Sequence, residues 1–243
     1  NGLRVKSQLA MTGKLIVFDG NDGSGKATQT KLMIERLENE GHKIRTIDFP
    51  RYYNNFFGKL IGECLTGAYG DFIAVDPHIT SVLYAADRFE TGDRIREWLA
   101  KGYIVIVDRY VSANQIHQGG KISDIVERRN FLEWLGEMEH GVFKTPKPDL
   151  VIYLDVPVEV SLRNLKGKKD KYQSSSDLHE TSEMFLRNSR ECGLWLVEQS
   201  NSWKSIVCAP EGDMRSVEDI HADAYQHIQD ILWKQSLLHL KIL

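Results

Sequence analysis

A glycine-rich segment with a single lysine is the part of the sequence that most clearly carries chemistry. It reads Gly20-Asn21-Asp22-Gly23-Ser24-Gly25-Lys26-Ala27-Thr28, follows a short apolar run and leads into a helix-forming stretch. Glycines let backbone N–H groups converge on phosphate oxygens, a helix N-terminus adds a positive field, and a lysine reaches the outer phosphates. The segment therefore predicts a loop that binds the β- and γ-phosphates of a ligand, with a plain glycine-rich turn as the alternative.

The spacing of the glycines separates this loop from the dinucleotide-binding kind. The order is G-x-x-G-x-G followed by lysine, whereas dinucleotide-binding loops read G-x-G-x-x-G. A dehydrogenase is therefore disfavoured, although Asp48 stands where a ribose-binding acid could lie. The strict phosphate-loop pattern has Ser or Thr after the lysine, but here that residue is Ala27, and Thr28 comes one position late. The usual hydroxyl ligand of Mg²⁺ is missing.

Short apolar runs alternate with stretches of helical pattern along the chain. The runs lack polar alternation, as strands buried on both faces of a parallel sheet do, and they cover residues 15–18, 44–49, 103–107, 150–154 and 205–208. Helices are predicted over residues 26–40, 77–100, 122–139, 158–165, 181–199 and 217–234. The second has Asp76 as N-cap and Pro77 at its first position. The alternation predicts an α/β fold with a parallel sheet covered on both sides.

Composition excludes several classes of protein. The 243 residues are 42% hydrophobic and 27% charged, which excludes a disordered chain and favours one domain over residues 14–243. The net charge of −3 is opposite to that of proteins that coat nucleic acid or anionic membrane, and no apolar run approaches the ~18 residues of a spanning helix. Three scattered cysteines form neither a disulfide framework nor a metal site. We expect a cytoplasmic protein in which residues 1–13 are an added, disordered leader and Met11 is a candidate start.

Further motifs follow the loop in a fixed order. They are Phe49-Pro50-Arg51, Tyr84-Ala-Ala-Asp-Arg88, Asp108-Arg109-Tyr110, Gln118-Gly119-Gly120, Pro146-Lys-Pro-Asp149, Leu154-Asp155-Val-Pro157 and Asp177-Leu-His-Glu180. Together with a loop of the form G-x-D-x-x-G-K-x-T, they make residues 14–199 resemble the thymidylate kinases, which are P-loop nucleoside-monophosphate kinases. The resemblance implies a three-layer fold with a five-stranded parallel sheet and a lid at about residues 166–180.

Tyr84 and Arg88 are four residues apart on a predicted helix and therefore share a face. The stripe expected to pack inward lies roughly opposite and consists of Ile79, Val82, Leu83 and Ala86. An aromatic ring beside a guanidinium suits a flat base that carries a carbonyl acceptor. The resemblance implies that the pair stacks on thymine and bonds to its O4, and a solvent-exposed Tyr–Arg pair is the alternative.

The resemblance also implies roles around the phosphates. Arg109 would bridge the donor and acceptor phosphates, since the planar fork of arginine matches phosphate oxygens, and Arg51 would hold the monophosphate. As alternatives, Arg51 is a surface charge and Asp108 caps a strand end. The implied catalytic residues are Lys26, Arg109, Asp22 and Arg51. The implied metal set, acting partly through water and phosphates because Ala27 cannot ligate, is Asp22, Asp108 and Glu180.

Residues 108–120 fit the family pattern D-R-x-x-x-S-x-x-A-Y-Q-G-G without gaps. The serine of that pattern is then Ala113. The tyrosine, which in the family helps to reject a ribose 2′-hydroxyl, is His117, with a partly exposed loop histidine as the alternative. Asn114 falls where some members place a polar residue against the base edge. The implied dTMP-binding residues are Asp22, Phe49, Pro50, Arg51, Tyr84, Arg88, Arg109, Asn114, His117 and Gln118.

The lysine-rich segment 166–171 has two interpretations. A solvated loop is the usual one, but the segment stands where the family lid closes its cations over ATP. The phosphate loop has no arginine at residues 21–24, so lid lysines such as Lys168 and Lys169 are the implied ATP ligands. Asp177 and Glu180 would act on metal-bound water or orient the lid, or are ordinary acids at a helix N-terminus.

The implied reaction is ATP + dTMP → ADP + dTDP, with Mg²⁺ as cofactor. The implied assembly is a homodimer. The predicted helix 122–139 carries Ile125, Leu132, Leu135 and Met138 at helical spacing, for which core packing is the first interpretation and a dimer face the second. Two alternatives stay open. The first is a kinase of the same architecture that acts on another nucleotide or a deoxynucleoside, and the second is a non-catalytic nucleotide-binding protein, suggested by Ala27.

Overall fold

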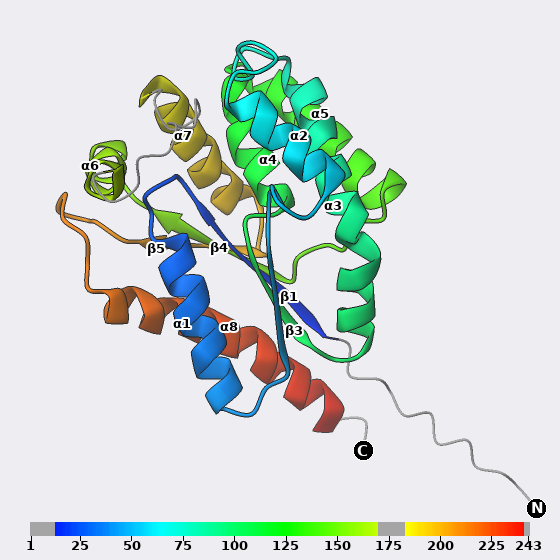
Figure 1. Ribbon diagram of the computed structural model, residues 1–243. Coiled ribbons are helices and arrows are strands. Elements are labelled where there is room, and N and C mark those ends of the chain that lie inside the picture. The colour runs from blue at the N-terminus through cyan, green and yellow to red at the C-terminus, as the bar shows by residue number, and fades with distance from the viewer. Residues whose placement is uncertain (1–12, 170–182, 241–243) are drawn as a thin grey trace, which may run out of the picture.

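Five parallel strands form the central layer of the protein, between two layers of helices (Figure 1). The structure is a computed structural model that describes residues 13–169 and 183–240. The strands run in the order β2-β3-β1-β4-β5 and are β1 (Lys14–Gly20), β2 (Ile44–Asp48), β3 (Ile104–Asp108), β4 (Leu150–Asp155) and β5 (Trp203–Val207). The predicted parallel sheet and its five strands are confirmed, with small shifts at the strand ends.

Most of the predicted helices are present. They are α1 (Lys26–Asn39), α3 (Pro77–Ala100), α6 (Val158–Lys169), α7 (Glu183–Gln199) and α8 (Val217–Leu240). Helix α3 begins as predicted, because the Asp76 carboxylate accepts the His78 N–H at 2.8 Å and Pro77 occupies the first turn. The pattern did not indicate α2 (Phe56–Leu65) or the short α4 (Val111–His117).

The single helix predicted over residues 122–139 is confirmed in part. The 3₁₀ turn η1 (Gly119–Lys121) precedes it, the helix α5 covers Ile125–Gly136, and the chain continues as the π-helical segment η2 (Glu137–Val142). Asp124 starts α5 late, because its carboxylate accepts the N–H groups of Val126 and Glu127 at 2.9 Å. The helix then widens at η2, where the Phe143 N–H bonds to the carbonyl of Met138.

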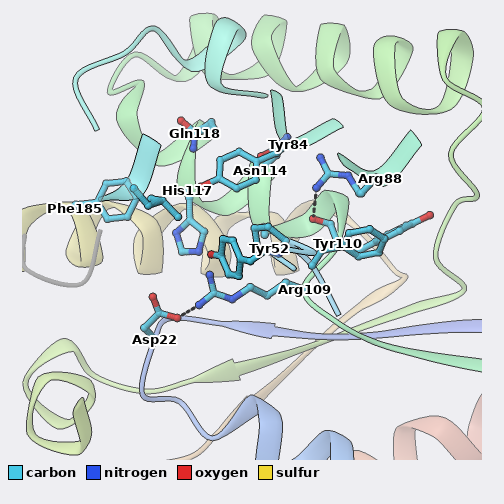
Figure 2. Close-up of a pocket in the computed structure, with 14 residues that line it drawn as sticks. Asp22, Tyr52, Tyr84, Arg88, Arg109, Tyr110, Asn114, His117, Gln118 and Phe185 are labelled. Atoms are coloured by element: carbon cyan, nitrogen blue, oxygen red, sulfur yellow. Dashed lines mark hydrogen bonds and ion pairs between the residues drawn. The ribbon is translucent and has the colours of Figure 1, made fainter. Parts of the chain in front are cut away.

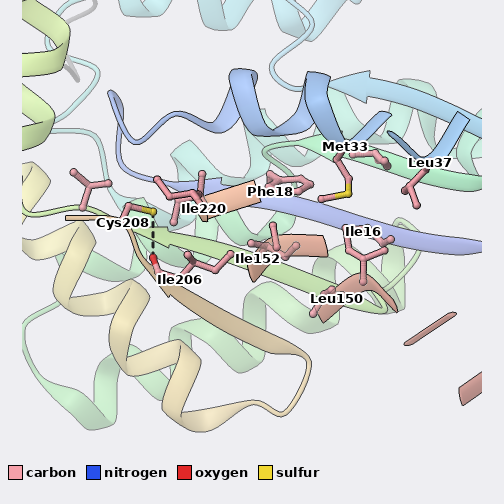
Figure 3. Packing of buried hydrophobic residues seen from close by; sticks show 14 of the residues in the cluster. Ile16, Phe18, Met33, Leu37, Leu150, Ile152, Ile206, Cys208 and Ile220 are labelled. Carbon is pink, nitrogen blue, oxygen red and sulfur yellow. Dashed lines mark hydrogen bonds between the residues drawn. The ribbon is translucent and has the colours of Figure 1, made fainter. Parts of the chain in front are cut away.

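Both faces of the sheet are apolar and covered. On β1, Ile16 and Phe18 face the layer of α1 and α8, whereas Leu15 and Val17 face the layer of α3, α4 and α7. Figure 3 shows the first of these cores, where Met33 of α1 packs over the sheet. Successive strand side chains point to opposite faces, so a strand covered on both sides reads as a continuous apolar run. This explains why the strands were recognisable in the sequence.

The stripe on α3 that was expected to pack inward is only partly buried: Leu83 packs against the cluster around Ile61, but Ile79 and Val82 face outward. Ile79 and Val82 are 64% and 41% exposed, whereas Arg88, on the opposite side of the helix, is 2% exposed. The prediction was wrong for Ile79 and Val82, because it assigned their side of the helix to the interior. In the fold that side has no neighbouring element among the described residues to cover Ile79 and Val82, and the polar side is turned towards the carboxyl ends of the strands.

Several sequence predictions concern segments beyond the described residues. Residues 1–12 of the expected leader and residues 170–180 of the expected lid are among them, as are Asp177 and Glu180. Residues 166–169 belong to the end of α6. Of the helices in residues 13–169 and 183–240, none is long and apolar enough to cross a membrane.

Alanine should have opposite effects on stability at two helical glycines. A Cβ on Gly193 of α7 would lie 2.5 Å from the ring of the buried Tyr153, whereas a Cβ on Gly136 of α5 would meet nothing within 4 Å. Gly193→Ala should lower the free energy of unfolding by about 1–3 kcal/mol through overpacking. Gly136→Ala, the matched control, should raise it by up to about 1 kcal/mol. Urea denaturation checks both, and equal effects of the two would contradict the packing seen at Tyr153.

Candidate active site

A pocket of about 550 Å³, measured to its open mouth, lies at the carboxyl ends of β1 and β3 (Figure 2). The connections that leave the neighbouring strands β1 and β3 run to opposite faces of the sheet, because α1 packs in one core and α4 in the other, and such a switch opens a crevice in parallel sheets. The lining residues are Asp22, Phe49, Pro50, Tyr52, Leu65, Tyr84, Arg88, Arg109, Tyr110, Ala113, Asn114, His117, Gln118 and Phe185.

The glycine-rich loop between β1 and α1 lies beside this pocket and contributes Asp22 to its lining. Gly23 and Gly25 have φ of 80° and 93°, which favour glycine, and a Cβ on Gly23 would lie 2.6 Å from the Ser161 carbonyl. Lys26 Nζ donates to the carbonyls of Gly20 and Asn21 at 2.9 and 2.8 Å. Since Gly25 precedes α1 without a capping side chain, the first N–H groups of the helix can bind an anion.

Hydrogen bonds to the helices on either side of the expected lid hold the loop. Asn164 of α6 donates from Nδ2 to the Gly23 carbonyl at 2.9 Å, and Asn21 of the loop donates from Nδ2 to the Leu186 carbonyl of α7 at 2.9 Å. The loop therefore depends on contacts with residues far away in the sequence. Ala27 and Thr28 are exposed on the first turn of α1.

Arg109 joins the loop to the pocket. It follows β3, its N–H bonds to the Phe18 carbonyl of β1 at 3.0 Å, and its guanidinium forms an ion pair with Asp22. Its φ of 62° lies in the left-handed region, which is uncommon for a residue with a side chain. Strain of this kind is found mostly at functional sites. Asp22 also lies 3.6 Å from Lys26 Nζ, so three charged groups meet at this point.

A buried carboxylate lies behind the loop. Asp19, at the end of β1, is 0% exposed; its Oδ2 accepts the Ser112 hydroxyl at 2.5 Å and its Oδ1 accepts the Gly20 N–H at 2.8 Å. Burial raises the pKa of Asp19, while the charge of Lys26 and the bond from Ser112 oppose that rise. Ser112 therefore helps to hold Asp19, which in turn bonds to the first residue of the loop. The sequence pattern had drawn attention to its neighbour Ala113 instead.

The far end of the pocket carries the aromatic and guanidinium groups of α3. The Tyr84 ring lies 6.1 Å from the Phe72 ring, and Arg88 donates from Nη1 to the Tyr110 carbonyl at 3.3 Å, as Figure 2 shows. Arg88 also donates from Nε to Glu139 at 3.0 Å. Tyr110 is buried beneath the pocket, and burial raises the pKa of its hydroxyl. A ring beside fixed donors suits a planar base.

The side wall of the pocket contains His117, at the position where the resemblance implied a tyrosine. The His117 ring stacks on Phe185 of α7 with centroids 5.5 Å apart, and its Nδ1 lies 3.1 Å from the Ser189 hydroxyl. Asn114 donates from Nδ2 to the Ser81 carbonyl at 3.2 Å. These contacts come from α3 and α7, so the wall is held by helices that are distant in the sequence.

Arg51 does not line the pocket. Its Nη1 lies 3.7 Å from Asp48, and its buried Nε has no hydrogen-bond partner in the described part of the chain. The turn that carries it is held by Asp87, which accepts the Arg51 N–H at 3.0 Å and the Asn55 side chain at 2.8 Å. Burial raises the pKa of Asp87, opposed by these two bonds. Arg51 is thus next to the site with donors still available.

The expected metal residues are only partly placed. Asp108 ends β3 in register with Phe18 of β1, close to the loop, and Asp22 lines the pocket. Glu180 falls outside the described residues, and only the helical backbone of Lys168 and Lys169 is described. Over residues 13–169 and 183–240, no group of three or more His, Cys, Asp or Glu side chains could hold a metal ion.

Comparison with known proteins decides the family. The sequence pattern described as thymidylate kinase matches residues 18–222. The chain belongs to the thymidylate kinase family. A protein of Thermococcus kodakarensis named probable thymidylate kinase is 32% identical over 225 residues, which cover 90% of this chain and 99% of that one. Human thymidylate kinase is 27% identical over 216 residues, covering 88% of this chain and 89% of its own.

A solved structure agrees on the fold. The structure of thymidylate kinase from Candida albicans superposes with a TM-score of 0.68 at 21% sequence identity, covering 90% of this chain and 92% of its own. The family fold, a five-stranded parallel sheet flanked by helices, is therefore the fold observed here.

Some pocket residues were missed by the sequence reasoning. Tyr52, Leu65 and Phe185 line the pocket without belonging to a quoted motif. Tyr52 directly follows Arg51, a signal that could have been used. Leu65 and Phe185 look like ordinary core residues in the sequence, and only packing brings them here.

The strained backbone at Arg109 has a matched counterpart at Lys144, whose φ is 54° and whose side chain is exposed. Glycine at either position relieves left-handed strain of about 1–2 kcal/mol but adds freedom to the unfolded chain. Arg109→Gly and Lys144→Gly should therefore both stay within about 1 kcal/mol of the parent in free energy of unfolding. ADP release should fall by about a hundredfold or more in Arg109→Gly alone. Equal activity in the two variants would refute a role for the Arg109 guanidinium.

Proposed function

We propose that this chain transfers the γ-phosphoryl group of ATP to dTMP, giving ADP and dTDP. The observation that carries the proposal is the position of Arg109, which contacts Asp22 of the phosphate loop and also lines the pocket that contains Tyr84 and Arg88. One guanidinium can thereby touch the phosphates of both nucleotides. Membership of the thymidylate kinase family supports the same reaction.

The reaction requires no covalent participation of the protein. The acceptor is a phosphate monoester, whose second pKa is about 6, so it is already ionised at neutral pH and no general base is needed. Catalysis then rests on holding two polyanions in line and neutralising them. In our proposal Lys26 and the α1 N-terminus bind the ATP phosphates, Arg109 bridges the phosphates, and Arg51 holds the phosphate of dTMP.

Mg²⁺ fits the groups present if it arrives with the nucleotide. Mg²⁺ is typically bound through one or two carboxylates, substrate phosphates and several waters. Asp22 and Asp108 supply two carboxylates beside the loop, in keeping with such a partial set. When bound, the ion would neutralise charge on the transferred group. Glu180 and the lysines Lys168 and Lys169 stay predictions for the ATP side.

The pocket suggests how dTMP is held. In our proposal the thymine ring stacks on Tyr84 and its O4 accepts from Arg88, while Asn114 and Gln118 lie along the base edge. His117 stands at the sugar, where its ring, fixed by Phe185 and Ser189, would crowd a ribose 2′-hydroxyl. Phe49 and Pro50, which directly precede Arg51 in the sequence, also line the pocket.

A substrate panel tests the reaction. With Mg²⁺-ATP, ADP release should be fastest with dTMP and about 10- to 200-fold slower with dUMP, because one methyl group in a pocket is worth only about 1–3 kcal/mol. Ribose-TMP, dCMP and AMP should be poorer acceptors. A preference for dCMP, AMP or a deoxynucleoside would assign a different kinase. A thermal shift with ATP or dTMP but no ADP would identify a non-catalytic binding protein.

We further propose that the protein is a cytoplasmic homodimer. The face suggested on the predicted helix 122–139 is not the one proposed, because Leu135 and Met138 are buried in the core. Ile79, Val82 and Phe89 are exposed and lie on one side of α3, because their spacing places them within one stripe of a helix. An exposed apolar stripe of this kind suits a second copy of the chain. Three free and buried cysteines suit a reducing compartment.

A charge on this stripe should separate the dimer. Val82→Glu should give the mass of a monomer in sedimentation equilibrium, since an isologous contact would place the new carboxylates against apolar surface or each other. Val217→Glu is the matched control, because Val217 of α8 is equally exposed at 41%. A parent protein that sediments as a monomer, or a Val82→Glu variant that stays dimeric, would contradict the assignment.

A further inference from the structure

A buried glutamate holds the arginine of the base pocket. Glu139 is 0% exposed, and its Oε1 accepts hydrogen bonds from Nε of Arg88 at 3.0 Å and from Nη2 of the same side chain. The two residues are 51 positions apart in the sequence. Every hydrogen bond of the Glu139 side chain within the described residues goes to Arg88, while its Oε2 has no partner there.

The π-helical segment η2 is what turns this glutamate inward. Met138 and Glu139 are consecutive and both buried, Met138 in an apolar cluster with Ala85 of α3. The Phe143 N–H bonds to the Met138 carbonyl at 2.9 Å and the Thr145 N–H to the Glu139 carbonyl at 2.8 Å, so the backbone turn is wider than in an α-helix. Single π turns inside helices occur frequently at functional sites.

The hydrogen bonds of Arg88 leave a defined set of donors for a ligand. A guanidinium has five N–H groups and no acceptor. Two of them bond to Glu139 and one bonds to the Tyr110 carbonyl at 3.3 Å. One N–H on Nη1 and one on Nη2 remain, on a side chain that lines the pocket. At this edge of the pocket Arg88 therefore offers only hydrogen-bond donors, and its bonds to Glu139 and to the Tyr110 carbonyl fix their orientation.

Charge balance supports the same arrangement. An isolated buried arginine would carry a large desolvation cost, and the carboxylate of Glu139 pairs with it where Arg88 is only 2% exposed. The pair is formally neutral and suits a neutral base. Removing only one partner would leave a buried charge without compensation.

We propose that Glu139 is a positioning residue for substrate choice, which fixes the Arg88 donors so that the pocket accepts a pyrimidine with a carbonyl at C4 and rejects one with an amino group. A C4 carbonyl accepts from the two remaining N–H groups, whereas a C4 amino group would set donor against donor. This inference rests on the proposed transfer to dTMP.

Glu139→Gln removes the charge and keeps the shape of the side chain. The KM for dTMP should rise about tenfold or more, with kcat at saturation changed less than about threefold and the KM for ATP within about twofold. The ratio of kcat/KM for dTMP over dCMP should fall at least about fivefold, because a less firmly held guanidinium no longer fixes its donors. A purely structural role would not change this ratio.

Glu137→Gln is the matched control, since Glu137 is exposed on the same segment η2. It should leave both KM values and the dTMP over dCMP ratio at the parent values. If the parent releases no ADP with dTMP, the proposed function fails. If the parent is active and Glu139→Gln keeps the parent ratio, only the role of Glu139 is overturned.

A second pair of variants covers the case in which Glu139→Gln does not fold. Arg88→Met/Glu139→Leu replaces both charges by apolar groups, an exchange that proteins often tolerate. It should match Arg88→Met in its KM for dTMP and in its dTMP over dCMP ratio, because Glu139 acts only through Arg88. A further loss in the double variant of about tenfold or more in either quantity would show that Glu139 acts independently and would overturn the proposal.

Discussion

The parallel pairing of β1 with β3 is the constraint on which the site depends. It places Phe18 opposite Asp108, so the phosphate loop and Arg109 leave neighbouring strands at the same edge of the sheet. The Arg109 N–H then bonds to the Phe18 carbonyl at 3.0 Å, and a left-handed backbone turns the guanidinium towards Asp22. A slip of one residue in this register would exchange the faces of all side chains on the strand and separate these groups.

Charged groups buried around the pocket add a second constraint. Asp19, Asp87 and Arg88 are each 2% exposed or less, and a buried charge is tolerated only when it is paired or hydrogen-bonded. Asp19 holds the first residue of the phosphate loop, Asp87 holds the turn that carries Arg51, and Arg88 is held by Glu139. Each partner is needed to avoid the cost of an unpaired group, so the networks keep the pocket in one arrangement.

Helix α3 joins the pocket to the outer surface. Tyr84 and Arg88 project towards the strand ends, whereas Ile79 and Val82 on the opposite side are exposed. Helical periodicity recognised the two faces but could not say which one points inward. A stripe of apolar residues is as compatible with a partner chain as with the core of its own chain. Here the charged side of the helix can face inward because Glu139 pairs with Arg88 and Asn55 donates a hydrogen bond to Asp87.

The sequence by itself determined the elements and motifs that act locally. Continuous apolar runs marked the strands, Asp76 and Pro77 marked the start of α3, and the spacing of glycines and Lys26 marked the phosphate loop, because these signals depend on neighbours within one turn or one strand. The tertiary structure alone decided which faces are buried, that η2 widens into a π turn, and that Glu139 meets Arg88. Contacts between residues 51 positions apart leave no local pattern, since they arise from how helices pack rather than from the period of any one of them.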